Sequence, residues 1–187
     1  GLMYEDVLDD TPIIQMNDYA MSKRVNEMQI YNSREQYKTK AVIVRFFNTY
    51  GPGEWYHPFR SVNCIFVYKL LNGIPITVYK GHTRTSTYIY DSVRTLANIV
   101  DNIIDGEIYN IASDQEHTIE HLAELLVKYT KADSSLVNYK NHSEVLTTKH
   151  KHVDASKVIK DLNHKNSVSL EEGVWETVQW MKEYYRL

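Results

Sequence analysis

The sequence predicts an α/β fold with a parallel sheet, for three reasons. Helical patterns alternate with short apolar strands along the 187 residues. Residues 41–47 form a nearly continuous apolar run, which is typical of a strand buried on both faces of a parallel sheet. The apolar share of 43% and the charged share of 24% are ordinary for a globular chain, and one of this length buries a real core.

Caps and apolar spacing determine the elements expected in the first half of the chain. Asn17 or Asp18 is placed to cap a helix, and Asn72 followed by Gly73 is typical of a helix C-terminus. A loop containing glycine and proline follows the apolar run. The expected elements are a loop over 1–16, helices over 18–36 and 60–72, and strands over 41–47, 76–79 and 86–90.

The second half shows the same alternation. Asp91 or Ser92 is expected to cap a helix whose apolar side chains share one face, namely Val93, Leu96, Ala97, Val100 and Ile104. Thr118 is expected to cap a helix with an apolar inner face, and Ser169 begins an S-x-x-E capping box for the last helix. A strand over 107–112 and a short helix over 154–162 complete the set, and no element is predicted for the polar residues 131–152.

Composition excludes several classes of function. The net charge of −3 argues against a broad nucleic-acid-binding face. No apolar run approaches the ~20 residues of a membrane span and no signal peptide opens the chain, so no membrane partner is expected. The single cysteine, Cys64, excludes a disulfide framework, is expected to be a buried small hydrophobe, and fits a reducing, cytoplasmic location.

Glycine is scarce in this chain. Its 7 glycines form neither a G-x-G-x-x-G nor a G-x-x-x-x-G-K-[ST] pattern. The sequence therefore contains no glycine-rich loop of the kind that cradles the phosphates of a dinucleotide or a nucleoside triphosphate.

Tyr19 and Lys23 form a Y-x-x-x-K pattern on the first expected helix. Positions i and i+4 share a helix face, so the phenol and the ammonium can converge on one substrate atom. A cation beside a phenol favours the phenolate, the form in which a tyrosine acts as a general base toward a hydroxyl near neutral pH. The pattern is not specific by itself, because a chain with 15 tyrosines contains about one such pair by chance.

Two further residues lie where ligands bind in parallel α/β proteins. Asn48 follows the strand expected at 41–47, and ligands bind at the carboxyl ends of parallel strands. Arg84 precedes the strand expected at 86–90, where it can make a bidentate contact with a phosphate. A plain strand end and a surface arginine are the ordinary alternatives.

The histidine patterns give weaker indications. His117, Glu120 and His121 match H-x-x-E-H, a zinc pattern that needs both histidines on one helix face. Thr118 as the N-cap places His117 outside the helix and no third ligand is evident, so no metal is expected. The run Lys-His-Lys-His over 149–152 is interpreted as a solvated polar segment.

The order of the motifs is more informative than any one of them. Tyr19-x-x-x-Lys23 is followed by R-x-x-N-x-Y-G-P from Arg45, by Arg84 before Tyr-Ile-Tyr-Asp91, and by segments 106–113 and 170–180. This order resembles the C-terminal portion of an extended short-chain dehydrogenase/reductase of the NAD-dependent epimerase/dehydratase family, which acts on nucleotide sugars. The resemblance implies an α/β fold with the C-terminal part of a Rossmann-type parallel sheet and a smaller α/β lobe that binds the substrate. The implied ranges are 1–50 and 92–115 for the NAD-binding remnant, and 51–91 and 116–187 for the lobe.

The resemblance also implies roles for individual residues. Tyr19 is the base that takes a proton from a sugar hydroxyl while hydride passes to the nicotinamide of NAD, and Lys23 holds the nicotinamide ribose. Both therefore count as catalytic and cofactor-binding. Asn48 contacts the sugar nucleotide near its diphosphate, and Arg84 binds the diphosphate. Asp91 ends the same segment and is placed with the substrate-binding residues.

Several positions depart from the family pattern. The catalytic Ser or Thr is expected just before Gly1, outside this chain, and Gly1-Leu2 stands where the 4,6-dehydratases have Asp-Glu. This favours an epimerase or a reductase. Thr85-Ser86 replaces the usual Asp-Phe after Arg84, and a second phosphate-binding arginine, expected some dozen residues before Asp154, is not found, with Glu144 near that place.

We therefore expect the chain to be part of an NAD-dependent nucleotide-sugar epimerase/dehydratase, inactive alone without the glycine-rich loop and the catalytic Ser or Thr. The alternatives are a 4,6-dehydratase, a 4-keto reductase, or a non-catalytic binding module derived from the family. The expected partner is a nucleotide-diphosphate sugar, with no nucleic acid and no membrane. A homodimer through the helix that bears Tyr19 and Lys23 is compatible with the sequence.

Overall fold

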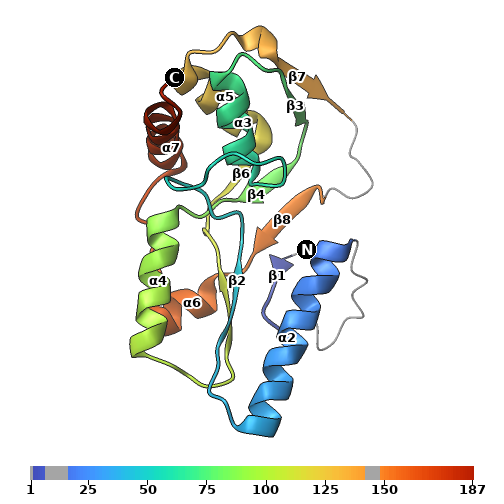
Figure 1. Cartoon of the computed structure of the whole chain (residues 1–187), viewed down its shortest axis with the longest axis vertical. Helices are drawn as coiled ribbons and strands as arrows, with labels where there is room; N and C mark the ends of the chain where they lie inside the picture. The colour runs from blue at the N-terminus through green and yellow to red at the C-terminus, as the bar shows by residue number, and fades with distance from the viewer. Residues whose placement is uncertain (1, 7–16, 142–147) are drawn as a thin grey trace.

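The computed structural model describes residues 2–6, 17–141 and 148–187 and confirms an α/β fold. Helices α3 (Val62–Leu71), α5 (Ile119–Thr130) and α7 (Leu170–Tyr185) gather with strands β3 (Ile76–Tyr79) and β7 (Val137–Lys140) in the upper part of Figure 1. The lower part holds β2 (Ile43–Phe46) with α4 (Ile89–Asp101) and α6 (Ser156–Leu162), and α2 (Asp18–Tyr37) lies to one side. The other elements are β1 (Leu2–Met3), β4 (Thr83–Thr85), β5 (Ile108–Ile111), β6 (Glu116–Thr118), the 3-10 turn η1 (Ser134–Leu136) and β8 (His150–Val153).

Strand pairing is mostly parallel, as the sequence predicts. Strands β2 and β5 pair in parallel with Ile43 opposite Ile108, and β3 pairs in parallel with β7. A four-stranded sheet has the order β1-β8-β4-β6, in which β4 is parallel to β8 and antiparallel to β6. This sheet brings residues that are far apart in the sequence side by side.

Two separate clusters of buried side chains form the core. The upper cluster packs α3, α5 and α7 together and includes Cys64, which is fully buried as expected. The lower cluster packs Tyr109 and Ile111 of β5 against Val158 and Leu162 of α6. Residues 153–162 thus join the cluster around β2 and β5, although they lie in a range assigned to the lobe. The boundaries of the two implied domains stay a prediction.

The predicted helix caps are confirmed at three positions. The side chain of Asn17 accepts a hydrogen bond from the Ala20 N–H at 2.9 Å. Thr118 caps α5 by accepting from His121, and Ser169 caps α7 by accepting from Glu172. Helix α3 has its C-cap at Asn72, and the following Gly73 has a positive φ of 67°, which a glycine adopts without strain.

The region around Asp91 differs from the prediction. The strand is β4, ending at Thr85, and α4 already begins at Ile89 with Tyr88 as its N-cap, so neither Asp91 nor Ser92 is the cap. The apolar side chains predicted to share one face are exposed at Val93, Leu96, Val100 and Ile104, of which Ile104 lies beyond the end of α4, whereas Asp91, Ser92, Thr95 and Ile99 are buried. Polar contacts made by Asp91 and Thr95 orient this helix together with the packing of Ile99 in the lower cluster.

Strands also occur in the segment expected to be a loop and in the segment for which no element is predicted. β1 lies within the expected loop over 1–16, of which residues 1 and 7–16 are outside the described residues. β7 lies within 131–152, and β8 begins there and ends at Val153; residues 142–147, including Glu144, are also outside the described residues. None of the helices described is both long and apolar enough to cross a membrane.

Candidate functional site

Tyr19 and Lys23 lie together on the first two turns of α2. The Lys23 ammonium is 5.3 Å from the centroid of the Tyr19 ring, as the i, i+4 spacing predicts. Tyr19 is 71% exposed, so its phenol is open to an incoming molecule. The pair therefore presents a phenol and a cation on one accessible surface.

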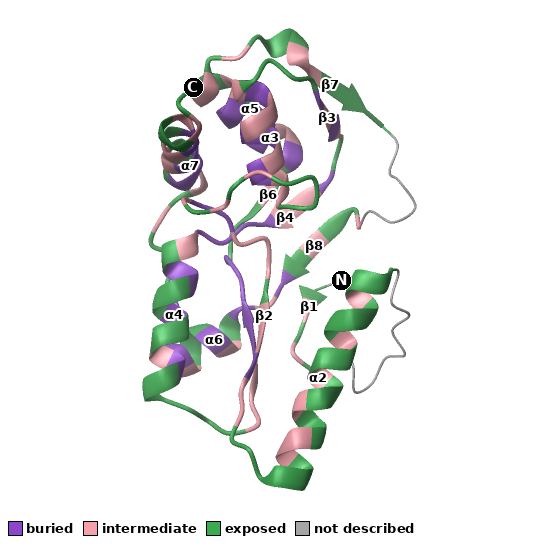
Figure 2. Cartoon of the chain, viewed as in Figure 1, coloured by how far each residue is buried: buried purple, intermediate pink, exposed green. Residues whose placement is uncertain are grey.

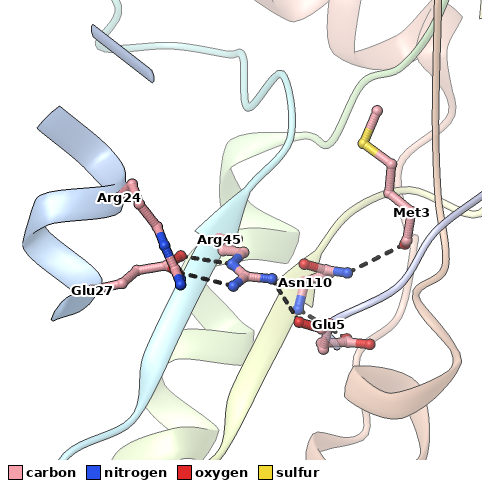
Figure 3. Close-up of polar contacts among 6 residues, drawn as sticks. All are labelled: Met3, Glu5, Arg24, Glu27, Arg45 and Asn110. Atoms are coloured by element: carbon pink, nitrogen blue, oxygen red, sulfur yellow. Dashed lines mark hydrogen bonds and ion pairs between the residues drawn. The ribbon is translucent and has the colours of Figure 1, made fainter. Parts of the chain in front are cut away.

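A cluster of ion pairs attaches α2 to the sheet (Figure 3). The Glu27 carboxylate accepts hydrogen bonds from Arg45 Nε at 2.7 Å and from Arg45 Nη2 at 3.0 Å. Arg24 reaches the same carboxylate at 3.3 Å. Glu27 lies four residues after Lys23. Tyr19, Lys23 and the anchoring Glu27 therefore lie along one face of the helix.

The same cluster continues into the segment that follows β1. Arg45 Nη1 donates to the Glu5 carbonyl at 2.8 Å, and the Glu5 carboxylate accepts from the Asn110 N–H at 3.1 Å. The Asn110 side chain donates to the Met3 carbonyl at 3.4 Å. Figure 3 shows how these contacts link β2, β5 and residues 3–5.

Asn48 follows β2 directly and approaches the end of β4. Its backbone has a φ of 45°, a left-handed conformation that asparagine tolerates better than most residues. The side-chain amide donates to the Thr85 carbonyl at 3.3 Å, and the Asn48 carbonyl accepts from Thr87 at 3.4 Å. The structure thus brings together the two segments that carry Asn48 and Arg84.

Arg84 is half-buried in β4 and lines an open cavity of about 230 Å³. Its Nη1 donates to the carbonyls of Thr83 and Lys149, at 2.6 Å and 3.1 Å, and no carboxylate of the described residues pairs with it. Burial lowers the pKa of its guanidinium. The other cavity-lining residues are mainly apolar or aromatic: Val62, Phe66, Thr77, Tyr79, His82 and Ile119.

Asp91 has contacts that hold the fold together. One carboxylate oxygen accepts from Arg94 at 2.9 Å, and the other accepts from the backbone of Ser167 at 3.0 Å and of Val168 at 3.3 Å. The side chain is 2% exposed. Its assignment to the substrate-binding residues stays a prediction.

His117 lies in β6, outside α5, as its position before the Thr118 cap predicts. Its Nε2 is 3.2 Å from the Ser86 hydroxyl, and burial lowers its pKa to about 4. Both residues line a second open cavity, of about 400 Å³, between the N-termini of α5 and α7. The described residues contain no group of three or more side chains able to hold a metal ion.

One residue that the sequence analysis missed is Lys151. The sequence predicts a solvated polar segment over 149–152, but residues 150–153 form β8 and Lys151 is half-buried opposite Arg84. The alternation of His, Lys, His and Val is the signal that indicates a strand. No hydrogen bond or ion pair joins Tyr19 or Lys23 to Asn48 or Arg84 within the part of the chain that the structure describes.

Three features fit the extended short-chain dehydrogenase/reductase class: parallel strand pairs, a helix bearing tyrosine and lysine four residues apart, and a strand-end asparagine that contacts the strand carrying Arg84. Residues 3–112 match the NAD dependent epimerase/dehydratase family, and the chain belongs to this family.

Curated relatives with different activities match the chain to similar degrees. A UDP-N-acetyl-alpha-D-glucosaminuronate decarboxylase from Bacillus cytotoxicus is 32% identical over 75% of the chain and 46% of its own length. A UDP-glucuronate 4-epimerase from Thermodesulfobacterium geofontis is 30% identical over 98% of the chain and 55% of its own length. A human dTDP-D-glucose 4,6-dehydratase is 26% identical over 99% and 54%. The chain thus spans about half the length of these relatives.

Solved structures confirm the fold across nearly the whole chain. An epimerase from Methanothermobacter thermautotrophicus superposes with a TM-score of 0.87 at 25% identity, covering 96% of this chain and 54% of that one. UDP-glucuronic acid 4-epimerase from Bacillus cereus, solved with UDP-glucuronic acid and NAD, gives a TM-score of 0.85 at 25% identity, covering 99% and 57%.

Proposed function

We propose that the chain provides the general base and part of the nucleotide-sugar pocket of an NAD-dependent nucleotide-sugar epimerase. The observation that carries this proposal is the pairing of Tyr19 with Lys23 on an accessible surface of α2, in a chain of this family. The relatives with known activities act on UDP-sugars or dTDP-sugars, which supports the substrate class.

In this mechanism Tyr19 removes the proton from a sugar hydroxyl. Lys23 favours the phenolate through its positive charge, because an ammonium close to a phenol stabilises the ionised form. The accessible phenol permits close approach of the hydroxyl, and the anchored helix holds the base in a fixed orientation while the proton moves.

Arg84 and Asn48 are proposed to bind the nucleotide end of the substrate. Among the described residues Arg84 has no carboxylate partner and no hydrogen bond from its Nε or Nη2, so these groups can donate to phosphate oxygens. The neighbouring cavity of about 230 Å³, lined by Val62, Phe66 and Tyr79, suits a nucleoside next to those phosphates. Asn48 lies against β4, where it can contact the diphosphate.

NAD fits this chain in part. Tyr19 and Lys23 are accessible and are the residues that would meet the nicotinamide ribose. The 7 glycines of the sequence form no phosphate-binding fingerprint, so the described residues do not account for binding of the dinucleotide phosphates. When bound, NAD would supply the reversible oxidation of the sugar carbon that an epimerase needs.

We further propose that the 187-residue chain is inactive by itself, because it carries no glycine-rich loop. Among the enzymes of the family, the residues Gly1-Leu2 favour an epimerase or a 4-keto reductase over a 4,6-dehydratase. The alternative that is not an enzyme is a non-catalytic binding module. Dimerisation through α2, which exposes Met21 and Met28, and a cytoplasmic location also stay predictions.

Calorimetric titration of the chain with UDP-glucuronate, UDP-glucose, dTDP-glucose and NAD tests the proposal. We expect binding of at least one nucleotide sugar, its loss in Arg84→Met, and no micromolar binding of NAD. Failure to bind any nucleotide sugar would contradict the proposed substrate class. Micromolar binding of NAD would contradict the proposal that this chain does not hold the dinucleotide by itself.

The chemistry is tested with a form of the protein that includes a glycine-rich cofactor-binding half. Tyr19→Phe removes the hydroxyl that accepts the proton, so turnover should fall by about 100-fold or more while nucleotide-sugar binding is retained. NMR analysis of the product separates epimerase, dehydratase and reductase. A Tyr19→Phe variant as active as the unaltered protein would rule out the general base.

A further inference from the structure

A row of three nitrogen-bearing side chains crosses the four-stranded sheet. Arg84 of β4 lies opposite Lys151 of β8 on one side and opposite His117 of β6 on the other. Residues directly opposite each other in neighbouring strands point to the same face of a sheet. Lys151, Arg84 and His117 therefore share one face, and strands in such a sheet are only about 4.8 Å apart.

The opposite face of the same strands holds the carboxylate that could have neutralised this row. Glu116 is opposite Thr85 and accepts a hydrogen bond from the Thr83 hydroxyl. That hydroxyl also lies 3.0 Å from His150 Nδ1. Because side chains alternate along a strand, Glu116 and His150 lie on the face away from Arg84 and Lys151.

Within the described residues, two cations are thus half-buried next to each other without a counter-ion. No described carboxylate forms an ion pair with Arg84 or Lys151. Burial and the neighbouring Arg84 guanidinium lower the pKa of the Lys151 ammonium, and the third member of the row, His117, stays neutral at pH 7. Like charges directly opposite in a sheet are destabilising, as are charges removed from water without a partner. A ligand with two negatively charged groups would offset both the repulsion between the two cations and the burial of each cation without a partner.

We propose that Lys151 is the second cation of a diphosphate-binding site and acts together with Arg84 on the phosphates of the nucleotide sugar. This inference rests on the proposed function and adds a residue to it. Arg84 provides a planar fork for one phosphate, and Lys151 provides a mobile point charge for the other.

The test measures binding of UDP, dTDP, pyrophosphate and uridine to the 187-residue chain by calorimetry. Lys151→Met keeps the apolar stem and removes the charge. We expect it to weaken binding of UDP, dTDP and pyrophosphate by about 10-fold or more, since a charge-assisted hydrogen bond is lost. Uridine binding should be unchanged. Lys160→Met, which removes one exposed lysine of α6, is the matched control and should stay within about twofold of the unaltered chain.

Thermal stability separates a binding role from a structural one. Lys151→Met removes an uncompensated charge, so the melting temperature without ligand should rise while affinity for diphosphates falls. Lys151→Arg, which keeps the charge, should retain most of the affinity. A fall in both stability and affinity in Lys151→Met, with no recovery in Lys151→Arg, would show a structural role and overturn the inference.

The outcomes also separate this inference from the proposed function. If Arg84→Met abolishes UDP and dTDP binding while Lys151→Met binds them as tightly as Lys160→Met, the inference is wrong and the proposed substrate class stands. If the unaltered chain binds neither UDP nor dTDP, the proposed function fails, and the inference fails with it.

Discussion

The unit of α3, α5 and α7 and the helix α2 are attached to the molecule in opposite ways. Each of the three helices contributes several buried apolar side chains to the upper cluster, among them Val67, Leu122 and Met181. Helix α2 has 20 residues and none of them is buried. Figure 2 shows the contrast, because α3 and α5 carry buried residues and α2 is exposed or intermediate along its length.

The difference shows how the motif-bearing helix is positioned. Within the described residues, two pairs make the side-chain hydrogen bonds that join α2 to the body beyond residue 40: Arg45 donates to Glu27, and Arg34 donates to Asp105. Apolar packing is strong but tolerates small rotations, whereas a bidentate ion pair fixes direction with few atoms. The helix that bears Tyr19 is therefore oriented precisely by contacts that are easier to break than those of the core.

The largest difference in the free energy of unfolding is expected when a methionine is replaced by alanine in each of the two regions. Met181 of α7 is fully buried and Met28 of α2 is 56% exposed. Met181→Ala should lower the free energy of unfolding by about 2–5 kcal/mol, because a buried side chain leaves a cavity. Met28→Ala should change it by less than about 0.5 kcal/mol. Urea denaturation of both variants checks this, and equal losses would contradict the contrast between the regions.

The second-largest effect is the pH dependence of stability that His117 of β6 is expected to cause. Burial lowers its folded pKa to about 4 from 6.5, so between these values the unfolded chain binds a proton that the folded chain does not. Stability should be full above pH 6.5 and fall as the pH drops toward 4, by up to about 3 kcal/mol from this residue. His117→Gln should flatten that part of the profile. Because other groups titrate in the same range, the difference between the two profiles is the measurement, and identical profiles would refute the assignment.

Local signals allowed much of the fold to be predicted from the sequence. Asn17, Thr118 and Ser169 cap helices because their side chains reach a backbone N–H three residues ahead, and this contact depends only on nearby residues. The Tyr19 and Lys23 pair was predictable for the same reason, since helix geometry sets it.

The errors lie where contacts between distant residues decide the outcome. The apolar pattern of α4 does not indicate its buried face, because Thr95 bonds to His164 and Asp91 to Ser167, both more than 65 residues away. Lys151 was misjudged because its burial depends on β8 pairing with β4. A polar run and a polar strand have nearly the same composition, and only the pairing partner distinguishes them.

The smallest of the three effects is expected at the anchor of α2. The side chains of Glu27 and Arg45 are 13% and 17% exposed, so their ion pair is only partly screened by water. Glu27→Gln removes the charge but keeps the shape, and should cost about 1–2 kcal/mol. Since α2 adds no buried side chain to the core, the loss should appear as local opening of the helix more than as a lower melting temperature.

Hydrogen exchange measured by mass spectrometry resolves such a local loss. Amide exchange within 18–37 should accelerate about 5- to 30-fold in Glu27→Gln, while exchange in α3, α5 and α7 stays unchanged. Glu35→Gln, an exposed substitution on the same helix without an ion pair among the described residues, is the control and should have little effect. Uniform acceleration across α2 and the upper helices would mean that α2 unfolds only with the core, and the distinction between a packed unit and a charge-anchored helix would be lost.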